Sequence, residues 1–268
     1  MNKTSIEWTD YTAGLIKSTH AGGPVSFDEW EARRILRTRT TGKRILMKGD
    51  PFEEDVPDAL LDRMFAVFAM RPDLTFQLLT KRPERMRKYL MDMERHYMAE
   101  VDGEYMERWG DAAVELTGDP CSAGGPIEDC GWPLSNVWLG VSVEDQEAAD
   151  ERIPHLLATP AAVRFLSCEP LLGRVNLKLG RGGDCRRCGN RYCLNGVHAE
   201  FPKSRLDWVI VGGESGPGAR PCDIGWIRGI VAQCQAAEVP VFVKQGSGPR
   251  PGMPTGDPEL DALKEFPR

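Results

Sequence analysis

The chain has 268 residues, of which 41% are hydrophobic and 28% charged, and its formal net charge is −6. This composition is typical of a globular domain with a substantial core, and no apolar run reaches the roughly 20 residues that span a bilayer. The first residues also lack the apolar stretch of a secretory signal. We therefore expect a cytoplasmic protein without a membrane partner, and the negative charge argues against one that coats nucleic acid non-specifically.

Six short apolar runs are rich in β-branched and aromatic residues, which is typical of strands buried on both faces of a parallel sheet. These runs are Lys43–Asp50, Leu74–Arg82, Asn136–Asp145, Ala162–Leu171, Leu206–Ser215 and Val239–Gln245.

Helical patterns lie between the runs. They predict helices over Pro57–Met70, from Pro83 onward, over Asp145–Leu157 and over Asp223–Ala237, and Pro154 is expected to bend or end the third. Alternating strands and helices predict an α/β fold with parallel strands, a (β/α) barrel or part of one. We expect one domain over residues 1–268, with excursions at about 94–133, which is acidic and glycine-rich, and at about 173–205.

The second excursion contains three cysteines and a histidine with the spacing of metal ligands, C-x2-C-x4-C-x4-H. These residues are Cys185, Cys188, Cys193 and His198. The spacing predicts a small structural zinc knuckle. Degenerate or partly occupied thiols, and a redox or iron–sulfur role, are the alternatives.

Polar residues follow each buried run, where the carboxyl ends of parallel strands meet and sites form. Glu169 is a carboxylate at a buried strand end, which is costly unless it is paired; Lys244, Lys81 and Arg82 are the candidate partners. The other polar residues at these ends are Asp50, Thr80, Ser142, Glu144 and Gln245. A structural ion pair is the plain alternative to a functional role for Glu169.

The segment Val211–Arg220 (VGGESGPGAR) joins a buried run to a later helix through four glycines. Gly212 and Gly213 allow close approach of a ligand, and their N–H groups are suited to an anion. Glu214 and Ser215 add an acceptor and a hydroxyl, and Arg220 adds a cation. The segment predicts ligand binding, and a purely structural turn is the alternative.

Two segments are locally basic, Glu31–Arg44 and Lys81–Lys88. A solvated helical face is the plain interpretation, and a rim that contacts phosphates is the other. Nucleic acid is therefore only a weak candidate partner, beside a small-molecule or nucleotide-like ligand.

Several motifs resemble a phage-encoded family of unknown function that is grouped with the radical-SAM enzymes. The matching stretches are IEWTDYT, DPFEEDVPD, TFQLLTKRPERM, NVWLGVSVEDQ, RFLSCEPLLG, WVIVGGESGPGARP and CQAAEVPVFVKQ. The resemblance implies a partial (β/α) barrel of the radical-SAM type that binds S-adenosylmethionine and a [4Fe–4S] cluster at the strand ends. By this analogy Lys48, Gly49 and Asp50 hold the methionine amino group, and Glu169 with Gly212–Ser215 lines the rest of the cavity.

Full members of that family carry a C-x5-C-x2-C motif soon after the IEWTD segment, and three thiolates there hold the cluster. This chain has no cysteine before Cys121, so the motif is missing. Three hypotheses follow. The first is an active radical-SAM-like enzyme on a nucleic-acid component or small substrate. The second is a ligand-binding or accessory barrel that has lost the cluster. The third is a non-redox enzyme that uses Glu144, Glu169 and Glu214 with Lys81 or Lys244 as acid and base groups.

Overall fold

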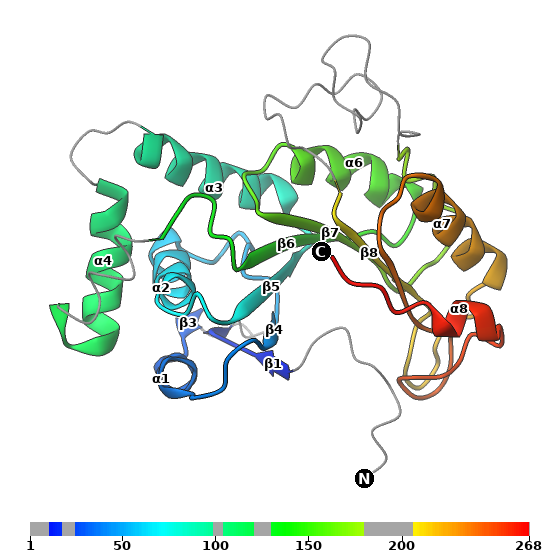
Figure 1. The fold of residues 1–268 in the computed structure, drawn as a ribbon, viewed down its shortest axis with the longest axis horizontal. Coiled ribbons are helices and arrows are strands. Elements are labelled where there is room, and N and C mark those ends of the chain that lie inside the picture. The colour runs from blue at the N-terminus through cyan, green and yellow to red at the C-terminus, as the bar shows by residue number, and fades with distance from the viewer. Residues whose placement is uncertain (1–10, 18–24, 99–103, 121–129, 180–205, 268) are drawn as a thin grey trace. The chain divides into compact units, whose positions relative to one another are not determined.

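The computed structural model describes residues 11–17, 25–98, 104–120, 130–179 and 206–267. Seven of its strands belong to one sheet, in the order β1-β4-β5-β6-β7-β8-β9 (Figure 1). Their bounds are β1 (Tyr11–Ala13), β4 (Arg44–Met47), β5 (Thr75–Thr80), β6 (Val137–Ser142), β7 (Val163–Cys168), β8 (Trp208–Gly212) and β9 (Val241–Gln245). A separate antiparallel pair consists of β2 (Ile16–Lys17) and β3 (Ser26–Phe27).

The helices of the described residues follow the strands along the chain. They are α1 (Glu29–Arg37), α2 (Asp58–Ala69), α3 (Pro83–Met98), α4 (Glu104–Thr117), α6 (Gln146–Leu157), α7 (Ile224–Ala236) and α8 (Pro258–Ala262). All six predicted strands and all four predicted helices are present. The pairs β1–β4, β4–β5, β7–β8 and β8–β9 are parallel. The fold is therefore α/β, as predicted, and is consistent with a partial (β/α) barrel.

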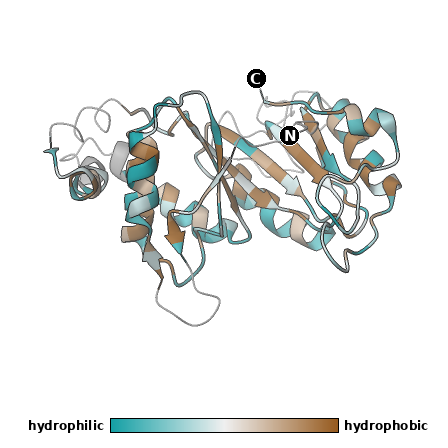
Figure 2. Ribbon diagram, turned by 90° about the horizontal axis from the view of Figure 1, so that it is seen from below, coloured by the Kyte–Doolittle hydropathy of each residue, from teal (hydrophilic) through white to brown (hydrophobic). Residues whose placement is uncertain are grey.

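The described chain divides into two compact units. We call Thr9–Leu139 with Thr159–Ala162 the N-terminal unit, and Gly140–Ala158 with Val163–Arg268 the C-terminal unit. Strand β6 contributes residues to both. Figure 2 shows apolar residues concentrated in the strands, whereas the helices carry both apolar and polar residues. This is the pattern expected of strands enclosed by amphipathic helices.

The core of the N-terminal unit is an aromatic cluster where α2 meets β5 and α4. Phe68 stacks on Phe76 with ring centroids 4.2 Å apart, and Phe65 stacks on Trp109 at 5.6 Å. Asn136, just before β6, is also buried here. Its side-chain amide donates to three backbone carbonyls, those of Phe68, Arg71 and Leu74. One buried amide thus ties the end of α2 and the turn after it to the start of β6, and its own N–H groups are satisfied.

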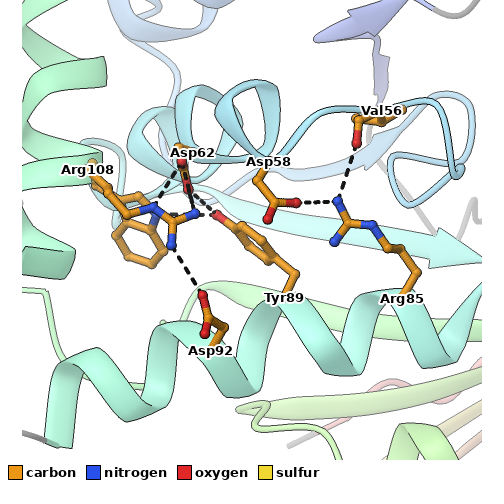
Figure 3. Close-up of polar contacts among 8 residues, drawn as sticks. Val56, Asp58, Asp62, Arg85, Tyr89, Asp92 and Arg108 are labelled. Atoms are coloured by element: carbon orange, nitrogen blue, oxygen red, sulfur yellow. Dashed lines mark hydrogen bonds and ion pairs between the residues drawn. The ribbon is translucent and has the colours of Figure 1, made fainter.

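A polar network joins α2, α3 and α4 in this unit (Figure 3). The Asp62 carboxylate on α2 accepts hydrogen bonds from Arg108 on α4, the shortest 2.8 Å long, and from the Tyr89 hydroxyl on α3 at 2.9 Å. Arg108 also lies 3.5 Å from Asp92. Burial raises the pKa of Asp62, although the positive charge of Arg108 opposes that change. The network is a partly buried ion pair that ties α2 to α4.

The core of the C-terminal unit is built from aromatic residues on β7, β8 and β9. Trp208 lies 5.9 Å from Phe165 and 6.2 Å from Phe242, measured between ring centroids. Gly140 on β6 faces the Phe165 ring so closely that a Cβ at this position would lie 2.4 Å from ring carbons. A side chain there is excluded by packing. Helix α7 packs against β8 and β9.

Pro154 was expected to bend or end its helix, and the second alternative is wrong, because α6 continues to Leu157. The proline lies in the last turn, where its missing N–H costs a single hydrogen bond, and the Asp145 side chain caps the other end of the helix by accepting from the Ala148 N–H at 2.9 Å. None of the described helices combines the length and the apolar character needed to span a bilayer.

Candidate functional site

Glu169, directly after β7, lies at the centre of the polar cluster in the C-terminal unit. One carboxylate oxygen lies 2.9 Å from the Lys244 ammonium, and the other accepts a hydrogen bond of 3.0 Å from the Gln245 amide. The Glu169 side chain is only 14% exposed, whereas that of Lys244 is 33% exposed. The predicted pairing of Glu169 with Lys244 is confirmed. A mostly buried carboxylate is thus held by two consecutive residues of β9.

An irregularity in β9 explains how two consecutive side chains reach the same carboxylate. Val211 pairs with Val243, but the next residue, Gly212, pairs with Gln245, so Lys244 is an extra residue in the ladder. In a regular strand, neighbouring side chains point to opposite faces of the sheet. A bulge breaks that alternation and re-aims a side chain, and bulges are common beside active sites.

Burial raises the pKa of Glu169, and the attraction of Lys244 opposes this effect. Gln245 holds the arrangement further, because its amide also donates to the Gly213 carbonyl at 3.1 Å and its oxygen accepts from the Gly252 N–H at 2.7 Å. The carboxylate is therefore fixed in position, partly desolvated, and paired with a cation that keeps some contact with solvent. Such a group can bind a cationic or hydrogen-bonding ligand, or exchange a proton with one.

The glycine-rich loop after β8 is closed by an ion pair. Glu214 accepts hydrogen bonds from the Arg220 guanidinium, the shortest 2.7 Å long, and from the Arg220 backbone N–H. Hydrogen bonding to Arg220 lowers the pKa of Glu214 to about 2. Both side chains are well solvated, so the pair gives the loop its shape and adds little to stability.

Gly213 is needed for a contact within the protein. A Cβ here would lie 2.4 Å from the Ser247 hydroxyl, and the Gly213 N–H donates to the Gln245 carbonyl at 3.0 Å. The Gly213 N–H is therefore already bonded within the protein. The sequence-based prediction that it binds an anion is wrong. Gly212 lies within β8, and Ser215 forms a bridge with Gly248 that ties the loop after β8 to the loop after β9.

A pocket of about 310 Å³ lies between these two loops and the start of α7. Ile224 and Ile227 of α7, with Pro221, form its apolar wall, and Cys222 and Ser247 supply polar atoms. The Ser247 hydroxyl oxygen is buried and has no hydrogen-bond partner among the described residues. Burial raises the pKa of the Cys222 thiol to about 11, so this thiol is protonated at neutral pH.

Two further predicted residues, Ser142 and Glu144, lie at the end of β6. Both are buried, and Arg152 of α6 donates to the Ser142 carbonyl and to the Glu144 carboxylate, each at 2.9 Å. Sequence reasoning did not identify Arg152, which lies two turns into a helix and outside every strand end. Arg152 forms an ion pair with Glu144 in which both side chains are mostly buried. In the Glu169–Lys244 pair, by contrast, the lysine side chain is 33% exposed.

The strand ends of the N-terminal unit bring the other predicted residues together. The Asp50 carboxylate accepts from the Phe52 N–H at 3.0 Å and from the Lys81 N–H at 2.8 Å, which links the ends of β4 and β5. Thr80 accepts from the Arg82 N–H at 2.8 Å. Gly49 has φ of +79°, a conformation that favours glycine. The side chains of Lys48, Lys81 and Arg82 are exposed.

The predicted metal ligands Cys185, Cys188, Cys193 and His198 lie outside the described residues. Among the residues that are described, no three His, Cys, Asp or Glu side chains form a group suited to a metal ion. The described cysteines are Cys130, Cys168, Cys222 and Cys234. A [4Fe–4S] cluster needs several neighbouring thiolates, so these residues do not fit one.

Fold and geometry together define an α/β protein with polar clusters at the carboxyl ends of its parallel strands. The chain belongs to the family described as "Protein of unknown function (DUF5131)", whose model matches residues 19–252. No curated protein matches the chain, and no solved structure does. The family match carries no statement of activity. Phage origin, radical-SAM descent and the roles of the site residues stay predictions.

Proposed function

We propose that this protein binds a small, polar, nucleotide-like molecule at the carboxyl ends of β7, β8 and β9, as an accessory barrel that works without an iron–sulfur cluster. One observation carries the proposal: the mostly buried Glu169 carboxylate is held by Lys244 and Gln245 across a bulged strand. Such a buried pair adds little to the free energy of unfolding, because the cost of desolvating both charges offsets much of their attraction. We therefore assign the Glu169–Lys244 pair to ligand binding.

The nearby pocket supports the same proposal. It is bounded by loops that follow β8 and β9, and its volume of about 310 Å³ falls within the range of small-molecule sites. Its lining combines the apolar residues Ile224 and Ile227 with the polar residues Ser247 and Thr255. The buried Ser247 hydroxyl has no hydrogen-bond partner among the described residues. An apolar wall with a few polar groups suits a heterocyclic ring with a hydrogen-bonding edge.

Isothermal titration with S-adenosylmethionine, the ligand that the sequence resemblance implies, tests this proposal. We expect the wild-type chain to bind and Glu169→Gln and Lys244→Met to bind at least about tenfold more weakly, because each removes one charge of the pair. Arg228→Gln is the matched control, since it removes an exposed ion pair with Asp257 in the same unit. If both test variants unfold at lower temperature but bind as tightly as wild type, the pair is structural and the proposal fails.

A non-redox enzyme is the second candidate, and the raised pKa of Glu169 is the observation that favours it. A carboxyl group with a raised pKa, next to a lysine, is a typical acid–base pair. In this case Glu169→Gln retains ligand binding and loses turnover. Ligand binding without any turnover by the wild-type chain favours the first candidate.

Metal and sulfide analysis after anaerobic purification and iron–sulfur reconstitution separates both candidates from radical chemistry. We expect about one zinc and no iron, with the zinc lost in Cys185→Ser, if the C-x2-C-x4-C-x4-H segment is a zinc knuckle. About four irons with sulfide would contradict this expectation and restore the radical-SAM hypothesis. Cys222→Ser is the control, because its thiol stays protonated at neutral pH and should not change the metal content.

A further inference from the structure

Helix α1 carries an exposed tryptophan on a basic face. Trp30 is 72% exposed. Among the described residues, it is the one large hydrophobic residue that is exposed. Arg33, Arg34 and Arg37 follow it at the i+3, i+4 and i+7 positions, so all four side chains share one face of the helix. All four of these residues are exposed. We call them, with Arg39 in the following loop, the α1 face.

The α1 face is not the side through which the helix packs against the fold. The opposite side of the helix carries Ala32 and Ile35, which are fully buried. The Asp28 side chain already caps the N-terminus by accepting from the Glu31 N–H at 3.0 Å. The helix therefore has its apolar contact and its cap without Trp30.

The charge around Trp30 is strongly positive in a chain that is negative overall. Residues 29–44 contain six arginines and lysines against two glutamates, whereas the whole chain has a net charge of −6. The two glutamates are paired: Glu31 with Arg34 at 2.6 Å, and Glu29 with Arg63 at 3.0 Å. Within the described parts of the chain, no side chain forms an ion pair or hydrogen bond with Arg37 or Arg39.

We propose that the α1 face binds single-stranded nucleic acid. Proteins that bind single strands combine cations that follow the phosphates with aromatic side chains on which bases stack, and Trp30 among its arginines is this combination. An exposed indole with neighbouring guanidinium groups also suits a base by cation–π and stacking contacts. The proposal concerns the N-terminal unit and is independent of the ligand proposed for the C-terminal unit.

A lipid surface is a poorer match. A helix that lies in a membrane interface needs a broad apolar face to insert between lipids. The apolar face of α1 is buried within the fold, and the exposed face offers the single apolar side chain of Trp30. A duplex is also a poorer match, because its bases are enclosed and offer no free ring to the indole.

Fluorescence anisotropy with a labelled oligo(dT) of about 12 nucleotides at low salt tests the proposal on the full chain. We expect Trp30→Ala to weaken binding on the order of tenfold and Trp30→Phe to retain most of it, because phenylalanine still presents a ring. The double variant Arg37→Ala/Arg39→Ala should make the slope of log K against log salt shallower by about 1.4, because each phosphate contact on a single strand contributes about 0.7. Arg95→Ala is the control, since Arg95 is 75% exposed on α3, away from the α1 face.

Four outcomes would overturn the proposal. One is no binding of the oligonucleotide by the wild-type chain, and another is equal binding by Trp30→Ala. A third is equal affinity for a duplex of the same length, which would show a general polyanion effect. The fourth is binding to vesicles of anionic lipid that Trp30→Ala abolishes, with no oligonucleotide bound, which would assign the face to a membrane. Circular dichroism of each variant confirms that α1 is intact.

Discussion

Replacing Arg108 by methionine is expected to lower the free energy of unfolding by about 3 kcal/mol at neutral pH, because it leaves the Asp62 carboxylate buried without its cation (Figure 3). The Asp62 side chain is 12% exposed, and only the Tyr89 hydroxyl would still donate to it. Methionine fills a volume similar to that of arginine, so packing changes little. The decrease in the free energy of unfolding therefore measures mainly the loss of the positive charge. Urea unfolding of both proteins measures the difference.

The pH dependence of this loss identifies its cause. Burial raises the pKa of Asp62 above 3.8, whereas the positive charge of Arg108 lowers it. Removing Arg108 therefore raises the pKa of Asp62 further. At a pH between its unfolded and its folded pKa, the Asp62 carboxyl binds a proton in the folded protein but not in the unfolded chain. The free energy of unfolding of the variant therefore falls as the pH rises through the folded pKa of Asp62. The loss should therefore be smallest below the unfolded value of 3.8.

Two further variants control this experiment. Arg95→Met removes an exposed arginine on α3, which lies 3.8 Å from the Asp92 carboxylate, and should change stability by less than about 0.5 kcal/mol. Asp62→Asn in the Arg108→Met background should recover part of the loss, because the amide carries no charge. A loss that is the same at every pH would show that lost packing, rather than the unpaired carboxylate, is responsible.

Gly140→Ala is expected to lower the free energy of unfolding by about 3 kcal/mol, at the upper end of the usual range for overpacking. The added Cβ would lie 2.4 Å from carbons of the Phe165 ring, which is fully buried and packs against Trp208. Thermal and urea unfolding measure the loss, and near-ultraviolet circular dichroism reports any change in the packing of Trp208.

A second substitution tests whether the ring is the obstacle. Phe165→Leu shortens the side chain, so in that background Gly140→Ala should cost much less than alone, and the two changes should be non-additive. Gly110→Ala on α4 is the matched control, because a Cβ there would meet nothing within 4 Å. Equal costs of Gly140→Ala in both backgrounds would mean that the Phe165 ring is not what excludes a side chain.

The strands and most helices could be predicted because each has a strong local pattern. The six predicted strands are continuous apolar runs that end in polar residues. Strand β1 was missed because the three residues Tyr11–Ala13 give no such run, and it is defined by its pairing with β4. Helix α1 was interpreted as a solvated helical face or a phosphate-contacting rim within Glu31–Arg44, without bounds of its own, since its buried side is small. Helix α4 lies within the stretch described as an acidic excursion.

The site could be predicted in part. Parallel strands place their carboxyl ends at one edge, so the strand assignment limited the partners of Glu169 to Lys244, Lys81 and Arg82, and the structure shows Lys244. The bulge at Lys244 could not be foreseen, because nothing in the run Val239–Gln245 distinguishes a bulged strand from a regular one. Likewise, the closeness of Gly213 to Ser247 depends on two loops that only the fold brings together.

The order of the strands in the sheet has a consequence for synthesis on the ribosome. The seven strands are neighbours in the order in which they are translated. The N-terminal unit uses residues up to 139 and a short return segment, Thr159–Ala162, so all of its parts exist before β8 and β9 are made. Because domains fold as units while the chain emerges, the aromatic core around Phe65 and Phe76 can close early, and its exposure to aggregation during translation is brief.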